Sequence, residues 1–118
     1  MTTKEIGDMG ETAACRYLES KGYTILERNF KIKTGEIDII AKDGECIVFT
    51  EVKTRKNTLY GEPSEYVDFR KQRRITRTAM YYTDTVNNEI RFDVIEVLYK
   101  MTGGKAVITS VNHIENAF

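Results

Sequence analysis

Two apolar runs and the turn signal between them dominate the stretch from Gly35 to Arg55. The runs lie on either side of Asp43-Gly44 and consist of Ile37, Ile39, Ile40, Ile47, Val48 and Phe49. Runs of this kind around an Asp-Gly pair predict a β-hairpin. Charged residues interrupt the apolar pattern: Asp38 lies among the isoleucines, and Glu51 and Lys53 follow the second run.

The face on which each of these charges lies follows from strand geometry. Successive side chains of a strand point to opposite faces, so Glu51 and Lys53 share one face of the second strand. A two-residue loop at Asp43-Gly44 would place Asp38 diagonal to Glu51, and a four-residue loop would place the two acids directly opposite. Both registers bring two carboxylates and an ammonium together. Because like charges across a sheet repel, a divalent cation with oxygen ligands is the natural counter-charge.

The remaining pattern predicts five further elements of secondary structure. A helical period runs from about Ile6 to Lys21 and stops at Gly22, a favourable residue after a helix. The other expected elements are a strand at Tyr23 to Ile32, a helix at Tyr66 to Thr85, and strands at Glu89 to Tyr99 and Lys105 to His113. The order is α-β-β-β-α-β-β, which predicts an α/β fold with a central five-stranded mixed sheet flanked by helices. With 118 residues, residues 1–118 are expected to form one domain.

The first helix carries an acid on its inward-facing side. Glu11, Ala14, Cys15 and Leu18 are spaced i, i+3, i+4 and i+7 and therefore share one face. Glu11 has two interpretations at this point. It is either part of a buried functional site or an acid at the edge of the stripe, stabilised by the positive end of the helix dipole.

The second helix has a basic side and an apolar side. The basic stripe combines four arginines with a tyrosine: Arg70, Arg73, Arg74, Arg77 and Tyr81. Arginine suits phosphate through its planar fork, so we interpret the stripe as a phosphate-binding surface rather than a solvated face. Lys71 lies between the two sides. We expect it to extend along the core edge with its ammonium in water, the alternative being that it reaches the acidic site.

Composition narrows the chemistry without revealing the partner. The chain has 18 basic and 18 acidic residues, so net charge does not indicate a polyanionic partner. The single histidine, His113, argues against a zinc site or a histidine-centred nucleophile triad. No secretory signal and no apolar run long enough to span a bilayer are present. We therefore expect a cytoplasmic protein without membrane contact.

Several motifs together resemble a known family. Asp38 followed by Glu51-Val52-Lys53 is similar to the D…ExK core of the restriction-endonuclease-like (PD-(D/E)xK) nucleases. Further motifs cover nearly the whole chain: Gly10-Glu11, Tyr17-Leu18, Gly22-Tyr23, Arg28-Asn29-Phe30, Gly35 to Ile40, Phe49 to Arg55, Lys71 to Ile75 and Arg91 to Val94. Together they resemble the YraN family, small bacterial proteins predicted to be nucleases and related in fold to archaeal Holliday-junction resolvases. Ile37 departs from the broader pattern, in which a proline often precedes the first acid.

The resemblance implies a role for each residue of the core motif. Asp38 and Glu51 would ligate Mg²⁺ or Mn²⁺, the carbonyl of Val52 would add a ligand, and Glu11 would complete the metal shell. Lys53 would orient or deprotonate the attacking water and offset the charge that develops on the phosphate. Magnesium commonly takes one or two carboxylates and keeps several waters, which agrees with this set.

The sequence therefore predicts a metal-dependent DNA endonuclease that hydrolyses phosphodiesters, on branched or otherwise structured DNA. Glu36 is expected to hold the metal ligands in place without binding the metal itself. DNA contacts are expected from Arg55, Arg70, Lys71, Arg73, Arg74 and Arg77. A homodimer is suggested by analogy with the resolvases, which need two active sites to cut two strands. The alternatives are a non-catalytic nucleic-acid-binding module and a protein-interaction scaffold with a merely structural charge cluster.

Overall fold

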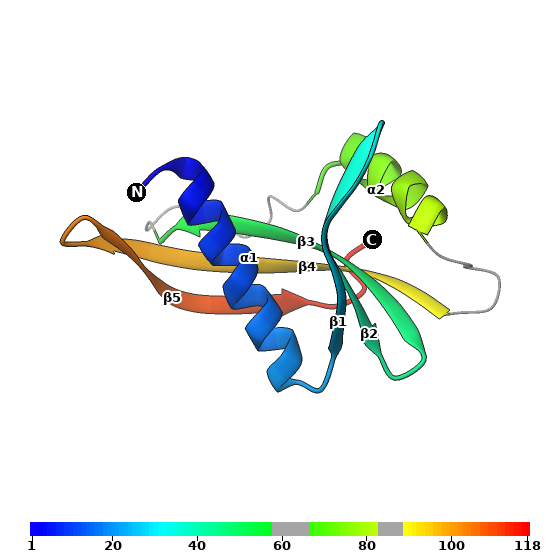
Figure 1. Cartoon of the computed structure of the whole chain (residues 1–118), viewed down its shortest axis with the longest axis horizontal. Helices are drawn as coiled ribbons and strands as arrows, with labels where there is room; N and C mark the ends of the chain where they lie inside the picture. The colour runs from blue at the N-terminus through cyan, green and yellow to red at the C-terminus, as the bar shows by residue number, and fades with distance from the viewer. Residues whose placement is uncertain (58–66, 83–88) are drawn as a thin grey trace.

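Two helices and five strands make up the structure, a computed structural model that describes residues 1–57, 67–82 and 89–118. In chain order they are α1 (Thr3–Ser20), β1 (Thr24–Ile32), β2 (Gly35–Asp43), β3 (Cys46–Lys56), α2 (Phe69–Tyr82), β4 (Glu89–Thr102) and β5 (Lys105–Ile114) (Figure 1). The predicted α/β class and element order are confirmed. The predicted ends of the second helix, Tyr66 and Thr85, lie outside the described residues.

The five strands form one sheet in the order β1-β2-β3-β4-β5. Every neighbouring pair is antiparallel except β3 and β4, which are parallel. Parallel neighbours need a crossover connection, and α2 lies within it. The sheet is thus mixed, as predicted. Neither described helix is long and apolar enough to cross a membrane.

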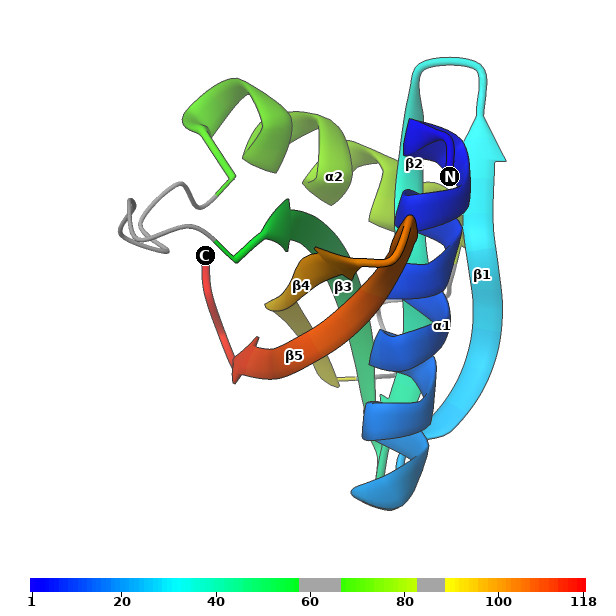
Figure 2. The same cartoon turned by 90° about the vertical axis from the view of Figure 1, so that its left-hand side faces the viewer.

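The helices cover opposite faces of this sheet (Figure 2). Helix α1 buries its small apolar side against the face that carries Val48, whereas α2 buries Ile75 and Ala79 against the face that carries Phe49. Adjacent residues of β3 therefore serve two separate hydrophobic clusters, as strand alternation requires. Each cluster holds one helix at a fixed position over the sheet.

Helix α1 begins three residues before its predicted start. Thr2 Oγ1 accepts from the Glu5 N–H at 3.1 Å, and the Glu5 carboxylate accepts from the Thr2 N–H at 2.7 Å. This reciprocal capping box satisfies two backbone donors and stabilises the first turn. Further along, a Cβ on Gly10 would collide with the side chain of Thr54 on β3. Glycine therefore lets α1 approach the sheet closely, next to Glu11.

The hairpin register differs in one respect from either expectation. Asp43 pairs with Cys46, so the turn is Gly44-Glu45 rather than Asp43-Gly44. Gly44 adopts a positive φ of 60°, which glycine tolerates at little cost. The strand pairing nevertheless matches that of the predicted four-residue loop: continued past the last pair, it places Asp38 opposite Glu51.

The β1–β2 hairpin is irregular at Asn29 of β1. In the pairing of the two strands, Asn29 falls at the same position as Asp38 of β2. Asn29 has a positive φ of 53°, a conformation that asparagine adopts more readily than most residues. On β2, Ile39 belongs to the cluster under α1, whereas Ile37 belongs to the cluster under α2. The simple alternation expected for this strand is therefore interrupted at Asp38.

Beyond this pivot the hairpin leaves the sheet. The pairing of β2 with β3 ends at Ile39, and the free end of the hairpin rises beside α2 (Figure 1). A Cβ on Gly35 would collide with the side chain of Thr78 on α2, so glycine permits this close contact. The result is a fork between β2 and β3 with Asp38 at its base.

Candidate active site

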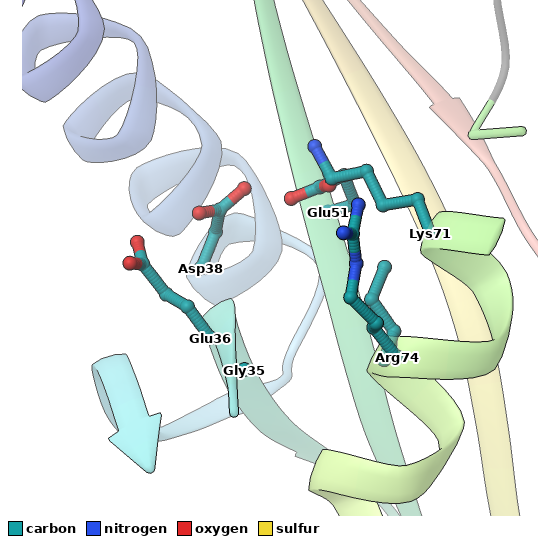
Figure 3. A pocket seen from close by; sticks show the side chains of 7 residues that line it. Gly35, Glu36, Asp38, Glu51, Lys71 and Arg74 are labelled. Carbon is teal, nitrogen blue, oxygen red and sulfur yellow. The ribbon is translucent and has the colours of Figure 1, made fainter. Parts of the chain in front are cut away.

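Two acids face each other in the fork between β2 and β3. Asp38 Oδ2 accepts a hydrogen bond from the Val52 N–H at 2.8 Å. Because β2 no longer pairs with β3 at this point, the carboxylate takes the place of a strand partner. Figure 3 shows the carboxylates of Asp38 and Glu51 directed toward one another. We call these two residues the acid pair.

The acid pair has too little positive charge around it to keep both carboxyl groups ionised. Burial raises the pKa of Asp38 to about 9, helped by the hydrogen bond and the charge of Glu51 and opposed by the Val52 N–H. A raised pKa means that the neutral form of Asp38 is favoured. A neutral Asp38 can share its proton with Glu51, so a single proton relieves the repulsion between two carboxyl groups.

A lysine from α2 supplies part of the missing charge. Lys71 Nζ lies 2.5 Å from Glu51 Oε2, and the Glu51 side chain is only 6% exposed. The expectation that Lys71 extends along the core edge into water was wrong, and the alternative, that it reaches the site, is what the structure has. The reason is the fork: it leaves open space between the sheet and the first turns of α2.

The acid pair opens into a hollow of about 290 Å³. Its walls come from β2, β3 and α2, and its lining residues are Gly35, Glu36, Asp38, Glu51, Lys71, Arg74 and Ile75. Glu36 lies on its exposed rim, while Lys71 and Arg74 reach in from the helix (Figure 3). An anion entering this hollow would meet two cations first and the acid pair behind them.

Glu11 lies near the acid pair but is engaged elsewhere. Its Oε1 is 3.7 Å from the Arg28 guanidinium of β1, and its charge contributes to the raised pKa of Asp38. Burial raises the pKa of Glu11 itself, opposed by Asn29 and Arg28. Glu11 does not line the hollow, and its role as a third metal ligand stays a prediction; its Oε1 is buried without a hydrogen-bond partner among the described residues.

Lys53 lies two residues after Glu51 and on the same face of β3. Its neighbour across the parallel ladder is Glu96 of β4, and it is not among the residues that line the hollow. Arg55, expected to contact DNA, is committed to the same acid: its Nη1 lies 3.3 Å from Glu96 Oε2. The structure thus brings Lys71 into contact with the acid pair and Arg55 into an ion pair with Glu96.

The arginine stripe forms one continuous surface. A hollow of about 280 Å³ is lined by the four arginines of the stripe, Arg70, Arg73, Arg74 and Arg77. We call this surface the arginine hollow. Arg74 also lines the hollow of the acid pair, so the two surfaces are contiguous. A phosphate chain lying on α2 would therefore reach the acid pair directly.

The donor set decides which metal the site fits. Nowhere in residues 1–57, 67–82 and 89–118 do three or more His, Cys, Asp or Glu side chains gather closely enough to hold a metal. A two-carboxylate site suits Mg²⁺ or Mn²⁺, which keep several water ligands, better than Zn²⁺. The raised pKa of Asp38 indicates unmet demand for positive charge there. Two carboxylates and solvent therefore fit such a cation.

A second buried acid was given no role by sequence reasoning. Asp93 of β4 is fully buried and accepts from Arg91 at 2.9 and 3.0 Å, from the Asn116 N–H at 2.9 Å, and pairs with His113 Nε2 at 2.7 Å. Burial alone would raise the pKa of Asp93, but these bonds lower it. An arginine two residues before an acid in an apolar strand was the available signal.

Sequence comparisons match this chain to a family of related proteins. A profile described as "Uncharacterised protein family UPF0102" matches residues 10–97. A UPF0102 protein of Clostridium botulinum (strain 657 / Type Ba4) is 50% identical over 119 residues, which cover 98% of this chain and 94% of that protein. One of Caldanaerobacter subterraneus subsp. tengcongensis is 49% identical over 118 residues, covering 98% and 95%.

Proposed function

The chain belongs to the family UPF0102, and from the chemistry of its acid pair we propose that it is a metal-dependent endonuclease that hydrolyses phosphodiester bonds in DNA. The observation that carries the proposal is the acid pair itself, two carboxyl groups that line the same hollow. Arg74 lines both this hollow and the arginine hollow. The resemblance of Asp38 and Glu51-Val52-Lys53 to the restriction-endonuclease-like core supports the same chemistry.

The protein's own groups divide the work of hydrolysis. Asp38 and Glu51, with the Val52 carbonyl, would hold Mg²⁺ or Mn²⁺. When bound, such a cation polarises a phosphate oxygen and makes a bound water more acidic. Arg74 can position a phosphate through its planar fork, and Lys71 can offset negative charge that develops during attack. Lys53 remains the candidate that the resemblance implies for orienting the water.

A non-catalytic DNA-binding module accounts for the arginine hollow but not for the acid pair. Carboxylates placed beside a phosphate surface repel the ligand unless a cation lies between them. A structural charge cluster would be expected to have its charges neutralised within the protein, as at Asp93. The position of the acid pair, in a hollow that shares Arg74 with the arginine hollow, supports the endonuclease over both alternatives. Homodimerisation and a cytoplasmic location remain predictions from the sequence.

The test is cleavage and metal binding in one variant. The double variant Asp38→Asn/Glu51→Gln keeps the shape of both side chains and removes both charges. We expect wild type to nick single-stranded, duplex or branched DNA with Mg²⁺ or Mn²⁺, and the variant to lose nicking. Metal should also raise the melting temperature of wild type by mass action and leave that of the variant unchanged. At a metal concentration 100 times the dissociation constant, the unfolding free energy of wild type should rise by about 2.7 kcal/mol.

The matched control is Asp8→Asn/Glu19→Gln, which removes the same two charges from the exposed side of α1. It should nick and respond to metal as wild type does. If wild type cuts none of the three substrates with either metal, the endonuclease proposal fails. If the Asp38→Asn/Glu51→Gln variant keeps the full thermal shift, the metal binds elsewhere.

A further inference from the structure

The outward side of α2 carries a third hollow, next to the two already described. It has a volume of about 350 Å³ and combines two phenylalanines with polar residues: Phe69, Gln72, Arg73, Thr76, Arg77 and Phe118. We call it the aromatic hollow. Phe69 is 71% exposed, which is unusual for a side chain of this size and places an aromatic ring where a partner can reach it.

The ring of Phe69 is held by a cation that also belongs to the phosphate surface. The Arg73 guanidinium lies 5.9 Å from the centroid of the Phe69 ring, within range of a cation–π interaction. Arg73 and Arg77 line both the aromatic hollow and the arginine hollow. These two arginines therefore form the border between the aromatic hollow and the arginine hollow.

The three hollows follow one another across α2. The aromatic hollow shares Arg73 and Arg77 with the arginine hollow, which shares Arg74 with the hollow of the acid pair. Across this surface the functional groups therefore follow in the order aromatic rings, four guanidinium groups and the acid pair. A nucleic-acid strand presents the matching groups, because every nucleotide offers a flat base and a phosphate.

We propose that the aromatic hollow holds an unpaired base of the strand to be cut, stacked on Phe69. This rests on the proposed function and narrows its substrate to single strands, flaps or branch points with an unpaired base near the cleaved bond. In continuous duplex the base faces are covered by their neighbours and cannot reach an aromatic ring. Single-strand-binding surfaces combine a basic groove with aromatic side chains in the same way.

Stacking rather than hydrogen bonding would dominate recognition in this hollow. Gln72 Nε2 donates to the Val67 carbonyl at 2.9 Å, and Thr76 Oγ1 donates to the Gln72 carbonyl at 2.8 Å. Both side chains therefore already donate to backbone carbonyls. Because every base has a π-face, stacking tolerates any sequence. The expected selectivity is therefore for unpaired over paired DNA, without preference for one base.

The experiment measures binding of a labelled single-stranded oligonucleotide and of the same sequence as duplex, without metal, over a series of salt concentrations. We expect Phe69→Ala to weaken single-strand binding about 5–100-fold, the range for loss of one stacked base, and to change duplex binding less than about two-fold. The salt dependence should not change, since no phosphate contact is lost. Arg73→Ala, in contrast, should weaken both and reduce the salt slope by about one.

The matched control is Val107→Ala, which removes another exposed apolar side chain, 43%, from β5, outside all three hollows. It should bind both DNAs as wild type does, and Phe69→Tyr should retain single-strand binding. An unchanged single-strand affinity of Phe69→Ala, or an equal loss on duplex, would overturn the inference while leaving the endonuclease intact. So would a change from dimer to monomer in Phe69→Ala with DNA binding unchanged, because Phe69 would then face a second copy of the chain.

Discussion

Two of the buried acid centres in the described part of the chain, at Asp93 and at Asp38, use similar groups and reach opposite electrostatic states. At Asp93, a fully buried carboxylate has an arginine, a histidine and a backbone N–H as partners, and its pKa is lowered. At Asp38, a half-buried carboxylate has one backbone N–H and a second acid as partners, and its pKa is raised. Burial is therefore not what separates them.

The difference lies in where the positive charge comes from. The Asp93 centre carries its own cation, Arg91, which also donates to Asp43 at the end of β2 and to Tyr23, the residue before β1. The acid pair has Lys71, whose side chain is 47% exposed and can leave without breaking the core. A centre that satisfies its own charges stabilises the fold, whereas one that does not is prepared for a cation or a proton from solution.

Removing the cation from each centre should give the largest contrast. We expect Lys71→Ala to slow metal-dependent nicking by about 10²–10⁴-fold, the usual worth of a positioned proton-transfer or charge-stabilising group, while its unfolding free energy changes by less than about 1 kcal/mol. Lys53→Ala should lose nicking and keep metal and DNA binding, as the resemblance implies. Nicking rates and urea denaturation curves measure the two effects.

Arg91→Ala is the counterpart of these lysine variants in the Asp93 centre. It removes one cation and should lower the unfolding free energy without acting on the chemical step. A lysine variant that nicks at the wild-type rate would exclude that lysine from catalysis. If only Lys53→Ala is slow, the contact between Lys71 and Glu51 is structural, and the comparison between the two centres weakens.

Neutralising the acid itself should separate the centres by stability. Asp93→Asn removes the buried carboxylate that Arg91, His113 and the Asn116 N–H all contact, and loss of one partner of a buried pair typically costs about 3–5 kcal/mol. Asp38→Asn keeps an acceptor for the Val52 N–H and removes repulsion with Glu51, so we expect stability to be unchanged or raised by about 0.5–2 kcal/mol. Urea denaturation in metal-free buffer provides both values, and a similar loss in both variants would mean that the centres are equivalent.

The fold was accessible from the sequence because its signals are local. Period-two and helical patterns, Gly22 after α1, and the turn signal near Gly44 define the elements and their order without knowledge of tertiary contacts. The exact turn was not accessible: Asp43-Gly44 and Gly44-Glu45 differ by one residue, and the strand pairing that decides between them depends on the whole sheet. The ends of α1 shifted because a capping box at Thr2 extends it.

The site was only partly accessible. Strand alternation and register bring Asp38 and Glu51 together, and the structure has them facing each other (Figure 3). The position of Lys71 depends on the fork between β2 and β3, which opens next to Asn29, a residue of β1 in a left-handed conformation. A single asparagine in a polar strand is a weak signal. The partners of Asp93 come from β4 and the C-terminal segment, and no sequence spacing connects them.

The pH dependence of stability should have opposite signs at the two centres. Asp38 keeps its proton in the folded protein up to a pKa of about 9, compared with an ordinary value of 3.8. Between these values the folded state binds more protons than the unfolded state, so stability falls as pH rises, by up to about 1.4 kcal/mol per pH unit for one proton. Asp93 has a lowered pKa, so its contribution is present above the ordinary value and is lost only as pH falls below it.

Between pH 5 and 8.5 the slope should therefore come from the acid pair and not from Asp93. Wild type in metal-free buffer should lose stability across this range more steeply than Asp38→Asn, as measured by denaturation at each pH. Saturating Mg²⁺ should flatten the difference, because a bound cation favours the ionised carboxylates and releases the shared proton. Identical slopes for wild type and Asp38→Asn would show that Asp38 is already ionised in the folded protein. The acid pair would then have to obtain its counter-charge from Lys71 alone, as Asp93 does from Arg91.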